Sequence, residues 1–142
     1  MLDPTLETRS VASAARRPIV VLLVDDQKFV SIAVGAMLQS QPDIELHSCQ
    51  SAVDAIALAN RILPTVILQD LMMPDIDGLT LVRAFRLNRL TAATPVIVLS
   101  GNDDTETRAR ALDAGAKGYL VKLPSQAELI ASIRRHTLPD AA

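Results

Sequence analysis

The chain has 142 residues, of which 49% are apolar, and its formal net charge is −2. This length suits a single domain with a full hydrophobic core, and the small charge excludes nucleic acid or an anionic membrane as the principal partner. The single cysteine, Cys49, excludes an internal disulfide and fits a reducing cytoplasm. The longest apolar run, residues 19–24, is too short to span a bilayer. We therefore expect a cytoplasmic domain.

The ends of the chain differ from its middle. Residues 1–17 mix acidic and basic side chains with Ser and Ala, and they lack the apolar centre of a signal peptide. No internal repeat or low-complexity segment divides the residues that follow. We expect a flexible leader over residues 1–17, one folded domain over residues 18–137 and a tail over residues 138–142.

Five short apolar segments are typical of strands. Unbroken β-branched runs, such as residues 19–24, indicate strands buried on both faces of a parallel sheet. Turn residues bound each run. The five expected strands are residues 19–24, 44–49, 65–69, 96–99 and 119–121.

Between these strands, apolar residues recur at helical spacing. Ser, Asn and Asp favour the starts of these helices, and Gly favours the position just past an end. The expected helices run from Phe29 to about Gln41, from a cap at Ser51 to Pro64, onward from Gly78, from Asn102 and Asp103 to Gly115, and from a cap at Ser125 past His136. Strict alternation of strands and helices predicts right-handed crossovers and a doubly wound α/β fold.

Polar side chains follow the carboxyl ends of these strands, where a doubly wound sheet binds its ligand. They are Asp25, Asp26, Asp70, Ser100 and Lys122. Clustered carboxylates repel one another unless a cation intervenes, and oxygen ligands without a nearby His or Cys pair favour Mg²⁺ over zinc. With a metal in place, Asp70 could attack phosphorus, Lys122 could neutralise the phosphoryl oxygens, and Ser100 could donate a hydrogen bond to them.

Taken together, these residues resemble the receiver domain of two-component response regulators over about residues 18–136. The resemblance implies a flavodoxin-like (βα)5 fold with a five-stranded parallel sheet of order 2-1-3-4-5. It also implies that Asp70 accepts a phosphoryl group, with Mg²⁺, from a sensor histidine kinase or a histidine phosphotransfer protein. Pro74 and Gly78 occupy two further positions of the family pattern. The residues that the resemblance assigns to roles are Asp25, Asp26, Asp70 and the backbone carbonyl of Met72 for the metal, Asp70, Lys122 and Ser100 for catalysis, and Ser100 and Tyr119 for the switch.

The resemblance further implies how the signal leaves the domain. Such domains catalyse their own phosphorylation and dephosphorylation but are not conventional enzymes. We expect phosphorylation to draw Ser100 inward, to turn Tyr119 from exposed to buried, and to alter the surface of residues 105–135. A downstream effector, an output domain or a second copy of the domain would then bind that surface.

One segment departs from the family pattern. The lysine is usually followed directly by proline, often after a cis bond, whereas this chain has Lys122-Leu123-Pro124. A cis bond before Leu123 is costly and one before Pro124 is not, so the resemblance does not determine the geometry of this loop, although it keeps the role of the lysine. This tripeptide and residues 65–81 are similar to receivers fused to diguanylate cyclases, which leaves the output open.

Two rival classes can be compared with the receiver. An aspartate-nucleophile phosphatase needs a second carboxylate two residues after the nucleophile, where Met72 stands. A phosphorylation-independent interaction module of the same fold is the alternative reading, but it would be expected to lose part of the acidic and lysine set, which is present.

Several other residues could suggest a functional site, but a structural role explains each of them. Residues 75–78 resemble part of a calcium loop, but the pattern fails at Met73 and Ala84, so we expect a turn. Cys49 fits a small buried apolar residue, and Arg134 and Arg135 fit a solvated helix end.

Overall fold

The computed structural model describes residues 18–138, and the leader expected over residues 1–17 lies outside them, as do residues 139–142 of the expected tail. Five parallel strands form one sheet in the order β2-β1-β3-β4-β5. The strands are β1 (Ile19–Val24), β2 (Ile44–Cys49), β3 (Val66–Asp70), β4 (Val96–Ser100) and β5 (Gly118–Val121). The expected doubly wound sheet and its strand order are confirmed.

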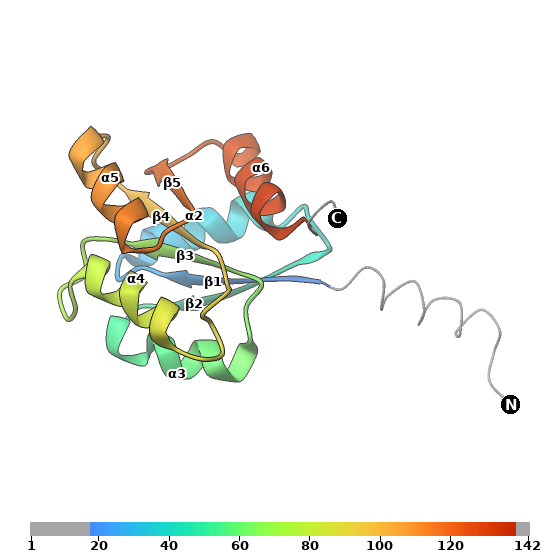
Figure 1. Cartoon of the computed structure of the whole chain (residues 1–142). Helices are drawn as coiled ribbons and strands as arrows, with labels where there is room; N and C mark the ends of the chain where they lie inside the picture. Colours follow the sequence, from blue (N-terminus) through green and yellow to red (C-terminus); the bar gives the residue numbers. More distant parts are fainter. Residues whose placement is uncertain (1–17, 139–142) are drawn as a thin grey trace, which may run out of the picture.

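The described helices cover both faces of this sheet (Figure 1). They are α2 (Lys28–Leu38), α3 (Ala52–Ile62), α4 (Gly78–Leu87), α5 (Thr105–Ala114) and α6 (Gln126–Thr137). Side chains of α2 and α6 pack on one face, and those of α3, α4 and α5 pack on the other. No helix within residues 18–138 is both long enough and apolar enough to cross a membrane.

The central strands are buried on both faces because their side chains alternate between two cores. In β1, Val21 and Leu23 join the core under α2 and α6, while Leu22 and Val24 join the core under α3, α4 and α5. All four side chains are fully buried, at 0% exposure. Continuous apolar strands of this kind require cover on both sides, and the helices supply it.

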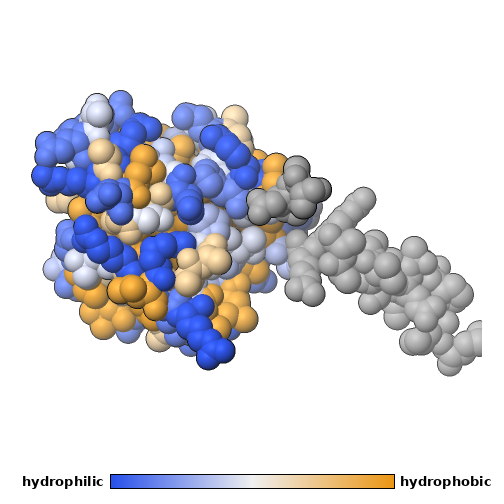
Figure 2. Space-filling view, in the orientation of Figure 1, coloured by the Kyte–Doolittle hydropathy of each residue, from blue (hydrophilic) through white to orange (hydrophobic). Residues whose placement is uncertain are grey.

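The helices that cover the α3, α4 and α5 face differ in their exposed side chains. In Figure 2, hydrophilic side chains gather over α5, and apolar side chains gather over α3. Val53 on α3 is 64% exposed. Because single exposed apolar residues are normal, this face alone assigns no partner.

The expected start of α3 is confirmed but its cap is not, and α5 starts slightly later than expected. Ser51 occupies the cap position of α3, but its side chain makes no capping hydrogen bond. The start of α5 is capped by Asp104, whose carboxylate accepts from the backbone N–H of Glu106 at 2.8 Å. Asn102 instead closes a local turn by accepting from the backbone N–H of Asp104 at 2.8 Å. A preceding polar side chain that satisfies a turn is not free to cap the helix.

Other local expectations are confirmed. Ser125 and Glu128 form a reciprocal capping box at the start of α6. Gly115 follows α5 with a φ of 121°, a conformation that suits glycine. Gly78 has a different reason, because a Cβ there would lie 2.4 Å from the Cα of Leu71. The turn after β3 therefore folds too closely on itself for any side chain at that position.

Arg134 lies at the partly exposed end of α6, as expected, but it also forms an ion pair that the sequence did not predict. Its guanidinium donates to both carboxylate oxygens of Asp43, at 2.8 and 3.0 Å, and to Gln41 Oε1 at 2.7 Å. The fork of five donors on arginine matches a carboxylate, so the pair fastens α6 to the turn before β2. Arg135, the next residue, is exposed as expected. Cys49 is buried as expected.

Candidate functional site

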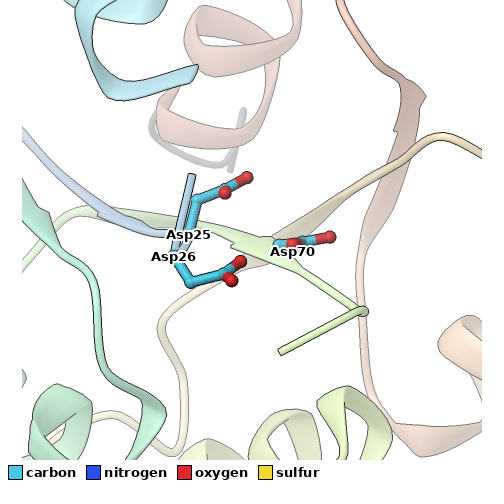
Figure 3. A group of neighbouring side chains, drawn as sticks. All are labelled: Asp25, Asp26 and Asp70. Carbon is cyan, nitrogen blue, oxygen red and sulfur yellow. The ribbon is translucent and has the colours of Figure 1, made fainter. Parts of the chain in front are cut away.

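Three carboxylates meet where β1 and β3 end. Asp25 and Asp26 follow the last residue of β1, and Asp70 is the last residue of β3. The two strands are adjacent, with Val24 paired to Gln69, so their ends lie side by side. One carboxylate oxygen from each aspartate lies within 4.8 Å of the others, and the three groups face the same space (Figure 3). The convergence predicted for the three aspartates is confirmed as geometry.

Lys122 joins the same cluster from the end of β5. Its Nζ lies 2.8 Å from Asp25 Oδ2 and 3.2 Å from Asp70 Oδ1. It is also 3.4 Å from Gln27 Oε1, a contact that the sequence did not predict. The backbone N–H of Lys122 donates to the Ser100 carbonyl at 2.8 Å, which fixes the loop beside β4. One cation therefore faces two of the three carboxylates.

The cluster is unfavourable for the charge on Asp70. Burial raises the pKa of this carboxyl above its ordinary value, and the nearby charge of Asp25 raises it further. The backbone N–H of Met72, which donates to Asp70 Oδ1 at 3.1 Å, and the ammonium of Lys122 both lower it. The raising effects exceed the lowering ones, so the folded protein holds an ionised Asp70 at a free-energy cost.

A divalent cation fits this donor set. Asp26 Oδ1 is buried and has no hydrogen-bond partner within residues 18–138, which is a costly state for a carboxylate oxygen. A hard cation that prefers oxygen ligands would bind that oxygen. It would also offset the repulsion among the three carboxylates, which the single charge of Lys122 does not balance. Met72 stands two residues after Asp70 in the same loop, and its side chain is exposed while its N–H binds Asp70.

The two expected switch residues are connected through a third. Ser100, the last residue of β4, is buried, and its Oγ accepts from the backbone N–H of Asn102 at 3.1 Å. The hydroxyl of Tyr119 donates to the carbonyl of Asn102. Tyr119 is buried, and the guanidinium of Arg108 lies 4.9 Å from its ring centre. Of the two states expected for this side chain, exposed and buried, the structure shows the buried one. Asn102 carries no signal in a single sequence that would have revealed this link.

The structure defines the geometry of the loop after Lys122, which the sequence left open. A cis peptide bond joins Lys122 to Leu123. The segment is held on both sides, by the bond from Lys122 to Ser100 and by the buried Pro124. The cis bond thus stands directly after the lysine, and the proline stands one residue later.

The fold and the site together define a flavodoxin-like domain with an acidic, lysine-contacted site at the carboxyl ends of its strands. Residues 21–134 match the family model described as the response regulator receiver domain. The chain belongs to this family, the receiver domains of two-component signalling systems, which is not a conventional enzyme family.

Curated relatives agree with that assignment. The response regulator protein VraR of Staphylococcus saprophyticus is 35% identical over 119 residues, which cover 83% of this chain and 56% of that protein. The transcriptional regulatory protein LiaR of Bacillus subtilis is 34% identical over 115 residues, covering 80% of this chain and 54% of that protein. The chain thus spans about half the length of these relatives.

Solved structures show the same fold. A response regulator from Chloroflexus aurantiacus superposes with a TM-score of 0.79 at 27% identity, covering 85% of this chain and 98% of that one. The receiver domain of a sensor histidine kinase from Pseudomonas aeruginosa superposes with a TM-score of 0.77 at 28% identity, covering 84% and 98%. That second structure holds a magnesium ion coordinated in its active-site cleft.

Proposed function

We propose that Asp70 is the phospho-acceptor of this receiver domain and takes its phosphoryl group from a sensor histidine kinase or a histidine phosphotransfer protein. The observation that carries the proposal is the meeting of Asp25, Asp26 and Asp70 within 4.8 Å, with Lys122 against two of them. A carboxylate oxygen of Asp70 forms the new bond to phosphorus. The bond from phosphorus to the donor imidazole breaks, and its electron pair stays on the imidazole nitrogen.

We assign the metal site to Asp25, Asp26, Asp70 and the backbone carbonyl of Met72. A bound Mg²⁺ would supply positive charge against the phosphoryl oxygens. The aspartates would hold and orient that cation, and Lys122 would exchange part of its contact with Asp25 and Asp70 for the incoming phosphoryl group. The same arrangement could position water against the aspartyl-phosphate, so that the domain also removes its own phosphoryl group.

The switch follows from the contacts of Ser100. A phosphoryl group on Asp70 brings new acceptor oxygens to the end of β3, and β4, which ends in Ser100, is its direct neighbour. If the Ser100 hydroxyl turns to donate to that group, its hydrogen bond with the N–H of Asn102 changes. The Tyr119 hydroxyl is bound to the same residue, so the change reaches β5 and the surface of α5, β5 and α6.

That surface is where we expect the output to be read. A downstream effector, an output domain elsewhere in the protein, or a second phosphorylated copy would bind it with higher affinity in one of the two states. Two-component signalling of this kind is a cytoplasmic process, and we place this domain there.

The experiment is phosphorylation with acetyl phosphate and Mg²⁺, followed by borohydride trapping and mass spectrometry. We expect one hydroxylamine-labile phosphoryl group, on Asp70, and none in Asp70→Asn. Amide exchange on the same samples should change over residues 105–135 in the wild type and much less in Ser100→Ala at equal phosphorylation. Label on a serine or a histidine, or no label, would contradict the mechanism and favour a phosphorylation-independent module.

A further inference from the structure

Asp75 connects two segments that are distant in the sequence. It lies in the loop between β3 and α4, five residues after Asp70, and its side chain is exposed. Its Oδ2 accepts from the backbone N–H of Val53 at 3.0 Å and from the Ser51 hydroxyl at 3.1 Å. Both partners belong to the start of α3, on the other side of the loop.

These bonds provide α3 with the cap that its own sequence does not provide. The side chain of Ser51, at the cap position, makes no capping bond, and instead donates to Asp75. A carboxylate at a helix start satisfies free backbone N–H groups and complements the helix dipole. The bond from Val53 is also the largest cause that lowers the pKa of Asp75, so the group is a carboxylate at neutral pH.

The start of α3 is in turn tied to the acidic cluster. The thiol of Cys49 donates to the Ser51 carbonyl at 3.1 Å, and the Cys49 carbonyl accepts from the backbone N–H of Asp25 at 3.0 Å. A continuous series of hydrogen bonds therefore runs from Asp75 through Ser51 and Cys49 to Asp25. The loop that follows Asp70 is thereby connected by hydrogen bonds to the end of β1.

We propose that Asp75 is a positioning residue, which fastens the loop of residues 71–77 to the start of α3 and so holds Met72 in place beside Asp70, to which its N–H is bonded. This inference rests on the metal site assigned above, and it concerns a residue that touches neither the metal nor the phosphoryl group. Without the bonds of Asp75, residues 71–77 would have to become ordered when the cation binds. The affinity for Mg²⁺ would fall because binding would then include the entropy cost of that ordering.

Asp77 provides a matched control in the same loop. Its Oδ2 accepts from the backbone N–H and the hydroxyl of Thr80, both at 3.2 Å, and so caps α4. The two aspartates are exposed, two residues apart, and each caps a helix. Asp77 binds only the helix that follows it, however, whereas Asp75 joins the loop to α3.

The test compares Asp75→Ala, Asp75→Asn and Asp77→Ala with the wild type, using thermal unfolding over a Mg²⁺ titration to obtain the dissociation constant. We expect Asp75→Ala to weaken Mg²⁺ binding about tenfold, in the range typical of groups that orient metal ligands. Asp75→Asn should recover much of this affinity, because the amide oxygen can still accept from Val53. Asp77→Ala should leave the dissociation constant within about twofold of the wild type, since its bonds are local to α4.

A second measurement needs no metal. Amide exchange of the metal-free proteins should show Val53 losing protection in Asp75→Ala and keeping it in Asp77→Ala. If Asp75→Ala does not fold, Ser51→Ala removes one of the two bonds and should shift both readouts in the same direction by a smaller amount.

The outcomes separate this inference from the proposed function. If the wild type itself shows no Mg²⁺-dependent stabilisation, the metal site of the proposed function and the positioning role of Asp75 are both overturned. If the wild type binds Mg²⁺ and Asp75→Ala binds it equally well, or if Asp77→Ala weakens it as much, the positioning role is overturned.

Discussion

The two edges of the sheet differ in how far their polar groups are satisfied by the fold. At the carboxyl edge, Asp26 Oδ1 and Gln69 Oε1 are buried without a hydrogen-bond partner among residues 18–138. Asp25 and Asp70 share a single ammonium, that of Lys122. This edge therefore contains groups that a ligand would satisfy and that the fold alone does not.

At the amino edge, the polar groups between α3 and α4 satisfy one another. The Thr91 hydroxyl donates to the Phe85 carbonyl at 2.7 Å and accepts from Asn88 Nδ2 at 2.9 Å. Asn88 Nδ2 also donates to Asn60 Oδ1 at 2.8 Å. The exception is Arg86 Nε, which is buried without a partner among the described residues, although the other two nitrogens of this guanidinium donate to backbone carbonyls. The amino edge thus contributes mainly to the stability of the fold, while the carboxyl edge keeps carboxylate charge available for binding.

The largest effect should come from Mg²⁺. At a hundredfold excess over its dissociation constant, mass action predicts a stabilisation of about 2.7 kcal/mol. The measurement is urea unfolding with and without the metal, and Asp26→Asn should lose most of the gain. A free energy of unfolding that does not respond to millimolar Mg²⁺ would mean that the carboxyl edge is not a cation site.

Thr91→Val tests the amino edge. The change keeps the shape of a fully buried side chain but removes its hydroxyl, which leaves the Phe85 carbonyl and one donor of Asn88 without a partner. We expect a loss of about 2 kcal/mol in the free energy of unfolding, and an unchanged response to Mg²⁺. A neutral result would show that this network is not what stabilises the amino edge.

The smallest effect should appear as a difference in pH dependence between the edges. Because the folded pKa of Asp70 is raised, its ionisation destabilises the fold above that pKa, and the penalty disappears as the pH falls toward 3.8. Asp70→Asn should therefore be more stable than the wild type in metal-free buffer at neutral pH, with the advantage vanishing in acid.

Asp43→Asn should behave in the opposite way. The hydrogen bond from Arg134 lowers the pKa of Asp43, so its contribution is present above 3.8 and is lost as the pH falls through the lowered folded value. The variant should be less stable than the wild type at neutral pH and should converge with it in acid. Parallel pH profiles for the two variants, measured by urea unfolding, would contradict the assigned environments.

Much of the fold was accessible from local patterns in the sequence. Unbroken apolar runs predicted the buried strands, and β1 begins and ends at the expected residues. The aspartates and Lys122 could be placed together because parallel strands present their carboxyl ends at one edge. An apolar run shows where each strand ends. Here the strand ends were enough to predict that the aspartates and Lys122 meet.

The rest depended on contacts between distant segments. Asp75 binds Val53 across 22 positions, and Arg134 binds Asp43 across 91. Nothing in the local sequence around Ser51 or Arg134 distinguishes a residue with such a partner from one without it. The link from Ser100 through Asn102 to Tyr119 was inaccessible for the same reason, since it combines a local turn with a contact across two strands.

The first and last described residues, Pro18 and Leu138, limit where another protein segment can be attached to the domain. β1 starts beside the turn before β2, and the end of α6 lies against the start of β5, where His136 contacts the Lys117 carbonyl. The start of β1 and the end of α6 therefore both lie at the amino edge of the sheet, opposite the aspartates (Figure 1). A tag or a reporter joined directly at Pro18 or Leu138 would begin at that opposite edge. It would respond to Asp70 only through the body of the domain, and so would not obstruct access to that residue.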